Sequence, residues 1–238
     1  MTQKRQAQPS RRKPDFRHAA TLLATHDSVI ARLVDEGGPP RIPAPNETHF
    51  ATLVRSIVYQ QLAGPAARAI HGRLIAALDD DVAADRVLNT GPEVLRACGL
   101  STRKVESLRD LATKTLDGTV VLDPRRLARI DDEEIINRLS TVKGIGRWSA
   151  QMFLIFQLRR LDVWPVDDLG VRKGYALAWS IPTPTPKQLE ALGEPYRPYR
   201  SVVAWYCWRT VELSSGTGVA LPVGQATAAT APQKGVAR

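Results

Sequence analysis

Apolar side chains recur along this chain at intervals of three and four residues, the spacing of one face of an α-helix. The clearest run follows Thr48 and consists of Phe50, Leu53, Val54, Ile57 and Val58. Runs of the same kind predict helices at 65–78, 101–112, 131–139, 168–179 and 198–213, with a shorter helix at 94–99. The run at 16–35 is interrupted near His26 and Asp27. The pattern predicts an all-α protein.

Two segments break the helical pattern. Residues 37–46 contain four prolines and two glycines, a composition that excludes regular structure and predicts a linker. Residues 117–124 contain the sequence TVVL, which predicts either one short strand or an extended link. At the two ends, residues 1–14 are basic and residues 214–238 have few apolar anchors. We therefore expect a disordered basic arm and a disordered tail.

The amino-acid composition indicates a polyanionic partner. The chain has 238 residues, 43% of them hydrophobic, and a net charge of +9, which favours nucleic acid as the partner. Its only cysteines are Cys98 and Cys207, too few for a disulfide framework or for an iron–sulfur cluster, which needs about four. No apolar run approaches the ~20 residues of a membrane span, and the N-terminus lacks the apolar core of a signal peptide. We expect a cytoplasmic protein, associated with the nucleoid in a bacterium, that binds no membrane.

A glycine hairpin stands at the centre of the chain, at Val142-Lys143-Gly144-Ile145-Gly146. Two glycines around one apolar residue allow a sharp turn and a close approach to a ligand. The N–H groups of the helix that follows attract anions, and basic side chains flank the turn. We expect contacts with DNA phosphates from Lys143, Gly144, Ile145, Gly146 and Arg147. The alternative is an ordinary turn between two helices, since many such turns contain glycine.

Two carboxylates follow the hairpin by about twenty residues, directly after Trp164 and Pro165. Asp167 and Asp168 are both suited to cap the next helix, and capping alone would explain either residue. Asp168 is the harder of the two to explain by capping. A carboxylate close behind a phosphate-binding hairpin is electrostatically unfavourable unless it meets a cation.

These motifs resemble those of a known family. The sequence LSTVKGIGRWSAQMF, followed by WPVDDLG, is similar to the helix-hairpin-helix and aspartate signature of the HhH-GPD DNA glycosylases, and within them to the DNA-3-methyladenine (alkylbase) type. Further matches at 59–62 and 198–208 extend the resemblance over residues 48–213. It implies two helical subdomains with a DNA-binding cleft between them. The terminal subdomain would comprise residues 15–47 and 160–213, and the central one, which carries the helix-hairpin-helix, residues 48–159.

The resemblance also implies roles for single residues. Asp168 would be catalytic, because a carboxylate stabilises the positive charge that builds on the deoxyribose as its base departs. Trp148 stands where bifunctional members carry a lysine that forms a Schiff base and then cleaves the strand. Tryptophan cannot perform that chemistry, so we expect base removal without lyase activity. The pocket for the cationic alkylated base is expected to contain Trp148, Met152, Trp208 and Trp205.

Three further expectations concern DNA contacts and ions. Gln61 and Leu62 match the family's wedge, which fills the gap left by the extruded base; alternatively the glutamines cap a helix and Leu62 lies in the core. Arg200 would hold a phosphate or only begin the last helix. The resemblance also implies a structural monovalent cation, sodium or potassium, on the backbone carbonyls of Ser140, Val142 and Gly144, and no required cofactor.

The sequence thus predicts a monomeric, monofunctional glycosylase of base excision repair that acts on damaged double-stranded DNA. Its expected substrates are alkylated purines such as 3-methyladenine and 7-methylguanine. Two alternatives remain at this point. One is a glycosylase of the same superfamily that removes another lesion, such as a deaminated base. The other is a catalytically silent protein that binds DNA structures.

Overall fold

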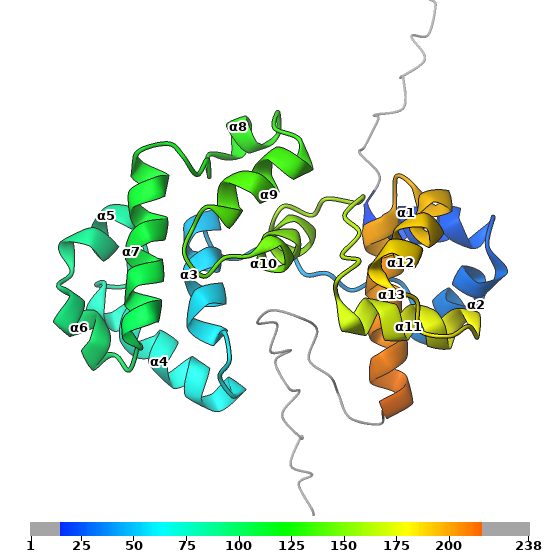
Figure 1. Ribbon diagram of the computed structural model, residues 1–238, viewed down its shortest axis with the longest axis horizontal. Coiled ribbons are helices and arrows are strands. Elements are labelled where there is room, and N and C mark those ends of the chain that lie inside the picture. Colours follow the sequence, from blue (N-terminus) through cyan, green and yellow to red (C-terminus); the bar gives the residue numbers. More distant parts are fainter. Residues whose placement is uncertain (1–14, 216–238) are drawn as a thin grey trace, which may run out of the picture.

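The protein is built of helices connected by short loops (Figure 1). The computed structural model describes residues 15–215, so the expected arm at 1–14 and the tail beyond residue 215 lie outside the described residues. The α-helices are α1 (Phe16–Ala24), α2 (Ser28–Gly37), α3 (His49–Tyr59), α4 (Gly64–Ala77), α5 (Ala84–Asn89), α6 (Pro92–Ala97), α7 (Thr102–Leu116), α8 (Pro124–Leu127), α9 (Asp132–Ser140), α10 (Arg147–Met152), α11 (Leu169–Trp179), α12 (Pro186–Gly193) and α13 (Arg200–Ser215). A π-helix, η1 (Phe153–Gln157), continues α10, and a 3₁₀ turn, η2 (Glu194–Tyr196), follows α12.

The helices form two groups (Figure 1). One group contains α3 to α9, and the other contains α1 and α2 from the start of the chain with α11, α12 and α13 from its end. Helix α10 lies between the two groups. The chain crosses from one group to the other through the irregular segment 38–48 and again after η1. The segments that carry the predicted site therefore come from both groups.

Helices α11 and α13 pack against each other at very short range because of one glycine. A Cβ atom at Gly174 would lie 2.0 Å from the backbone carbonyl oxygen of Cys207, which no side chain could tolerate. The middle of α11 is thereby fixed against the middle of α13. This contact determines which side chains of α13 reach Asp168.

The all-α prediction is confirmed, since residues 15–215 contain no strand. The TVVL segment is an irregular link, in which Val120 N–H donates to the Lys114 carbonyl at 2.7 Å. The predicted interruption near residue 27 is present, because the Asp27 side chain caps α2 by accepting from the N–H groups of Val29 and Ile30. Residues 214 and 215, expected in the tail, complete α13.

Other helix limits differ from the expectation. The short helices α5 and α8 were not predicted, and the helix after the hairpin changes to a π-helix at Phe153. The last helix begins at Arg200 rather than at Pro198. Among the described residues, no helix is both long and apolar enough to cross a membrane.

Candidate active site

The glycine hairpin is held in place by α7. Asp110 on α7 accepts a hydrogen bond from the Lys143 backbone N–H at 2.7 Å and pairs with Lys114 at 2.9 Å. The Lys114 ammonium also donates to the Thr141 carbonyl. Gly144 has a φ of +81°, and a Cβ atom there would lie 2.8 Å from Ser107 Oγ. The turn therefore requires glycine at 144 both for its conformation and for its contact with α7.

The basic side chains at the hairpin are differently placed. The Lys143 side chain is exposed, in keeping with a role at a DNA phosphate. Arg147 is half exposed and forms a bidentate pair with Glu133, at 2.6 and 2.8 Å. The hydrogen bonds from Arg147 lower the pKa of the Glu133 carboxyl. A phosphate that binds Arg147 has to replace or share this carboxylate partner.

Asp168 is the N-cap of α11 and accepts three hydrogen bonds. Its Oδ1 accepts from the Val171 N–H at 2.8 Å and from Trp208 Nε1 at 3.0 Å. Its Oδ2 accepts from Trp148 Nε1 at 2.6 Å. The residue is 8% exposed. The carboxylate is thus oriented from the cap, from α13 and from α10 at once.

The hydrogen-bond partners of Asp168 are neutral N–H groups. None of the ion pairs formed within residues 15–215 involves Asp168. N–H donors satisfy the carboxylate oxygens without neutralising its charge. Its negative charge therefore remains available to a cationic species that enters the site.

Gly170 keeps α13 close to this carboxylate. A Cβ atom on Gly170 would lie 2.9 Å from Cδ1 of Trp208 and 3.0 Å from Oδ1 of Asp168. Any larger residue would push the indole and the carboxylate apart. The glycine in the sequence WPVDDLG is thus part of the geometry of the site.

The four expected pocket residues do not share one environment. Trp148 is 39% exposed and presents its ring at the surface beside Asp168. Trp208 is buried, and its ring stacks on Phe156 with 5.8 Å between centroids. Trp208 therefore contacts the Asp168 carboxylate from the protein interior, and its hydrogen bond orients that carboxylate.

The structure does not support Met152 and Trp205 as walls of the base pocket. Met152 is 1% exposed and Trp205 is 4% exposed, and both belong to the hydrophobic core. Trp205 packs edge-on against Tyr206, at 5.1 Å between centroids. Neither side chain offers surface to a base, because each is enclosed by other core residues. The one-turn spacing from Trp148 to Met152 placed them on one face of a helix, but α10 exposes only the end of that face.

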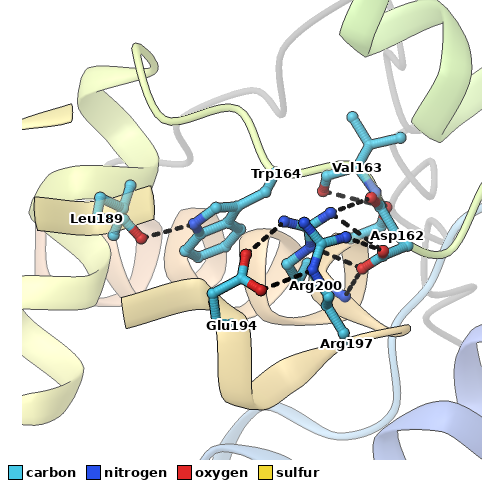
Figure 2. A network of polar contacts seen from close by, with 8 residues as sticks. Asp162, Val163, Trp164, Leu189, Glu194, Arg197 and Arg200 are labelled. Carbon is cyan, nitrogen blue, oxygen red and sulfur yellow. Dashed lines mark hydrogen bonds and ion pairs between the residues drawn. The ribbon is translucent and has the colours of Figure 1, made fainter. Parts of the chain in front are cut away.

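The structure also does not support Arg200 as a phosphate-binding residue, because its guanidinium is bound within the protein (Figure 2). Its guanidinium is bound to Asp162 by contacts of 2.7 and 3.0 Å with the carboxylate and 3.1 Å with the carbonyl. Glu194 lies 3.6 Å from its third nitrogen. Arg200 is buried within this network, where it anchors the segment before Trp164 to the start of α13. It is therefore a structural residue.

The expected wedge lies in the loop between α3 and α4. Gln61 has a φ of 57°, a left-handed conformation uncommon outside glycine, and is exposed. Leu62 is 37% exposed, so the alternative that placed it in the core is wrong. An exposed leucine at the tip of a short loop is suited to insertion between bases.

The carbonyl set expected to bind a monovalent cation fits such an ion poorly. The Val142 oxygen already accepts from Ile145 N–H at 3.0 Å, and the Gly144 oxygen accepts from Gln60 Nε2 at 2.8 Å. Two of the three oxygens are thus engaged in hydrogen bonds.

Several residues of the site were missed from the sequence. Lys104, Ser107, Asp110 and Lys114 support the wedge loop and the hairpin from one stripe of α7. The sequence does show that these polar residues recur at intervals of three and four along the helix. Periodicity placed them on one face and gave no sign of what they contact.

Comparison with known proteins identifies the family. Residues 54–198 match the HhH-GPD superfamily of base excision DNA repair proteins. The chain is 36% identical to DNA-3-methyladenine glycosylase 1 of Schizosaccharomyces pombe, over 79% of this chain and 83% of that protein. It is 30% identical to the DNA-3-methyladenine glycosylase of Saccharomyces cerevisiae, over 74% and 71% of the two chains.

Solved structures agree with this assignment. The 3-methyladenine DNA glycosylase Mag1 of S. pombe, in complex with abasic DNA, superposes with a TM-score of 0.70 at 35% identity, covering 82% of this chain and 97% of that one. A DNA-3-methyladenine glycosidase from Bacillus halodurans superposes with a TM-score of 0.75 at 30% identity, covering 84% and 92%. This chain therefore belongs to the HhH-GPD superfamily of base excision DNA repair proteins.

Proposed function

We propose that this protein is a monofunctional DNA glycosylase that removes alkylated purines, such as 3-methyladenine and 7-methylguanine, from double-stranded DNA. The observation that carries the proposal is the carboxylate of Asp168, oriented by Trp148 and Trp208 and free of any ion pair within residues 15–215. The names of the relatives, DNA-3-methyladenine glycosylases from two yeasts, support the same substrate class.

In the proposed reaction, the bond between C1′ and the base nitrogen breaks and the base leaves with the bonding electrons. The sugar becomes cationic, and the negative charge of Asp168 stabilises it. Water then forms a bond to C1′ and gives its proton to Asp168, which releases it to solvent. An alkylated purine is already cationic and leaves as a neutral base, so no second acid is needed. The exposed ring of Trp148 offers a π-face to this cation.

DNA is proposed to lie across the two groups of helices. The hairpin with Lys143 binds backbone phosphates, and Gln61 and Leu62 enter the duplex where the base has been extruded. The absence of a lysine at position 148 supports hydrolysis without strand cleavage. We propose that the protein acts as a monomer in the cytoplasm, and its two buried free cysteines, Cys98 and Cys207, are compatible with a reducing compartment.

The test is base release from duplexes that each carry one defined lesion, measured with and without later treatment with alkali. We expect release of 3-methyladenine and 7-methylguanine, with strand breaks only after alkali. Breaks without alkali would contradict the monofunctional assignment. Release restricted to deaminated bases would favour the related glycosylase with another substrate. Binding of all duplexes with no release would identify a silent DNA-binding protein.

A further inference from the structure

Gln60 connects the loop that carries the expected wedge to the glycine hairpin. Gln60 is the C-cap residue of α3, directly precedes Gln61 and is half-buried. Its side-chain amide Nε2 donates a 2.8 Å hydrogen bond to the backbone carbonyl of Gly144. The two residues are 84 positions apart in the sequence. Two segments expected to contact DNA are thus in direct contact with each other.

Helix α7 supports both segments. At one end, the Lys104 ammonium donates to the carbonyls of Val58 and Gln60, at 2.6 and 2.8 Å. One turn further on, Ser107 lies against the Cα of Gly144. Asp110, one more turn along, accepts from the Lys143 N–H. The loop and the hairpin therefore share one rigid base, and Gln60 bridges them above it.

The bridge depends on a hydrogen-bond donor at position 60. The Gly144 carbonyl can only accept a hydrogen bond, so its partner must donate, and Nε2 of a glutamine does so without adding charge. The bond fixes the peptide that follows Gly144, in the turn whose N–H groups face the expected phosphate. A movement of the hairpin is thereby transmitted to the residue that precedes the wedge.

We propose that Gln60 is a positioning residue for base extrusion. It holds the wedge at a fixed distance from the phosphate-binding hairpin, so that gripping the backbone and filling the gap in the duplex occur as one rigid motion. This inference rests on the proposed glycosylase function and adds to it the coupling between binding and extrusion. The residue touches neither the base nor the reacting atoms.

The test compares two substrates that differ only in how easily the lesion leaves the helix. In one, 7-methylguanine is paired with cytosine; in the other, it lies opposite a short gap and is already unpaired. Extrusion from an unpaired site requires little energy, so a defect in extrusion disappears there. The variant is Gln60→Met, which keeps the length of the side chain and removes the donor.

We expect Gln60→Met to slow single-turnover release from the paired site about 3- to 10-fold, the effect of losing one hydrogen bond. Release from the unpaired site and the affinity for undamaged duplex should stay within about twofold of the parent protein. Gln60→Glu, which sets an acceptor against the Gly144 carbonyl, should show the same selective defect more strongly. It also serves as a second variant if Gln60→Met does not fold.

A matched control is Gln157→Met. Gln157 Nε2 donates to the Glu47 carbonyl at 3.0 Å and also lies 3.0 Å from Nδ1 of His49, and neither contact involves the wedge loop or the hairpin. This variant should lower the melting temperature and leave the ratio of paired to unpaired release unchanged. Equal loss on both substrates in Gln60→Met, or no loss on either, would overturn the coupling. Failure of the parent protein to release any base would instead overturn the proposed function.

Discussion

The indole Nε1–H of Trp148 donates a 2.6 Å hydrogen bond to Oδ2 of Asp168, and this bond joins the only exposed aromatic ring of the expected pocket set to the proposed catalytic carboxylate. The ring belongs to α10, and the carboxylate caps α11, so the contact spans the junction between the hairpin and the terminal group of helices. Oδ1 is held separately by the α11 backbone and by Trp208. Within residues 15–215, Oδ2 accepts one hydrogen bond, from Trp148, so we propose that Oδ2 is the oxygen that faces the substrate.

Removing the charge of Asp168 should abolish turnover and spare DNA binding. Asp168→Asn keeps an oxygen for the α11 cap but cannot stabilise a cationic sugar, so single-turnover release should fall at least about 100-fold. Affinity for lesion-containing duplex, measured by fluorescence anisotropy, should change little. Asp167→Asn makes the same change in charge at the exposed neighbour and should be nearly as active as the parent protein. A near-normal rate for Asp168→Asn would refute the assignment.

The ring of Trp148 should favour cationic lesions. Trp148→Leu removes the π-face, and release of 7-methylguanine, compared as kcat/KM, should fall by about 2- to 30-fold, the range of one cation–π contact. Release of neutral hypoxanthine, if present, should fall less. Trp148→Phe keeps a smaller π-face, so its kcat/KM for 7-methylguanine should lie between those of the parent protein and Trp148→Leu. Equal losses for cationic and neutral bases would show that Trp148 acts only through its bond to Asp168.

Trp208 and Trp205 form a matched pair, one turn apart on α13. Trp208→Phe loses the 3.0 Å hydrogen bond to Asp168, and turnover should fall about 10- to 100-fold, as expected for a bond to a charged acceptor. Trp205→Phe removes an Nε1–H that has no hydrogen-bond partner within the described part of the chain, so turnover should stay unchanged. The measurements are the rate of base release and the melting temperature of each variant. An equal loss in the two variants would mean that packing alone explains Trp208.

Gly174 should be one of the least replaceable residues of the fold. Its missing Cβ would lie 2.0 Å from the Cys207 carbonyl, so Gly174→Ala has to separate α11 from α13 and should lower the free energy of unfolding by about 3 kcal/mol or more. Gly72→Ala is the control, because its added Cβ would meet no atom within 4 Å and α4 is helical there. The free energy of unfolding of Gly72→Ala should be higher than that of the parent protein by about 0.5–1 kcal/mol. Urea unfolding measures both, and similar values for the two would contradict the close packing.

The anchor of the hairpin should weaken at acidic pH. Burial alone would raise the pKa of Asp110, but hydrogen bonds from Lys143 N–H and Lys114 outweigh it and hold the pKa below its ordinary value of 3.8. A lowered pKa in the folded state stabilises the protein above pH 3.8, and this contribution is lost as the pH falls through the folded-state value. The difference in unfolding free energy between the parent protein and Asp110→Asn should be constant from about pH 7 to about pH 5 and shrink below about pH 4. A difference that grows on acidification would contradict this sign.

The sequence by itself determined the helical fold class, most of the helices, the hairpin and the position of Asp168 at the start of α11. These features are local, because a helical stripe, a cap and a glycine turn are each written in fewer than about twenty consecutive residues. The family resemblance was carried by the same local motifs. It singled out Trp148 and Asp168, whose side chains are hydrogen-bonded to each other in the structure.

Only the tertiary structure decided what each of these residues contacts. Residues 200–208 of α13 are all buried, so periodicity could not show that Trp208 faces Asp168 while Trp205 faces the core. Arg200 was indistinguishable from a phosphate ligand until Asp162, 38 residues away, was found bound to it. The bridge from Gln60 to Gly144 spans 84 residues and joins a side chain to a backbone carbonyl. Such contacts depend on how separate helices pack, and the spacing of residues along one helix does not encode them.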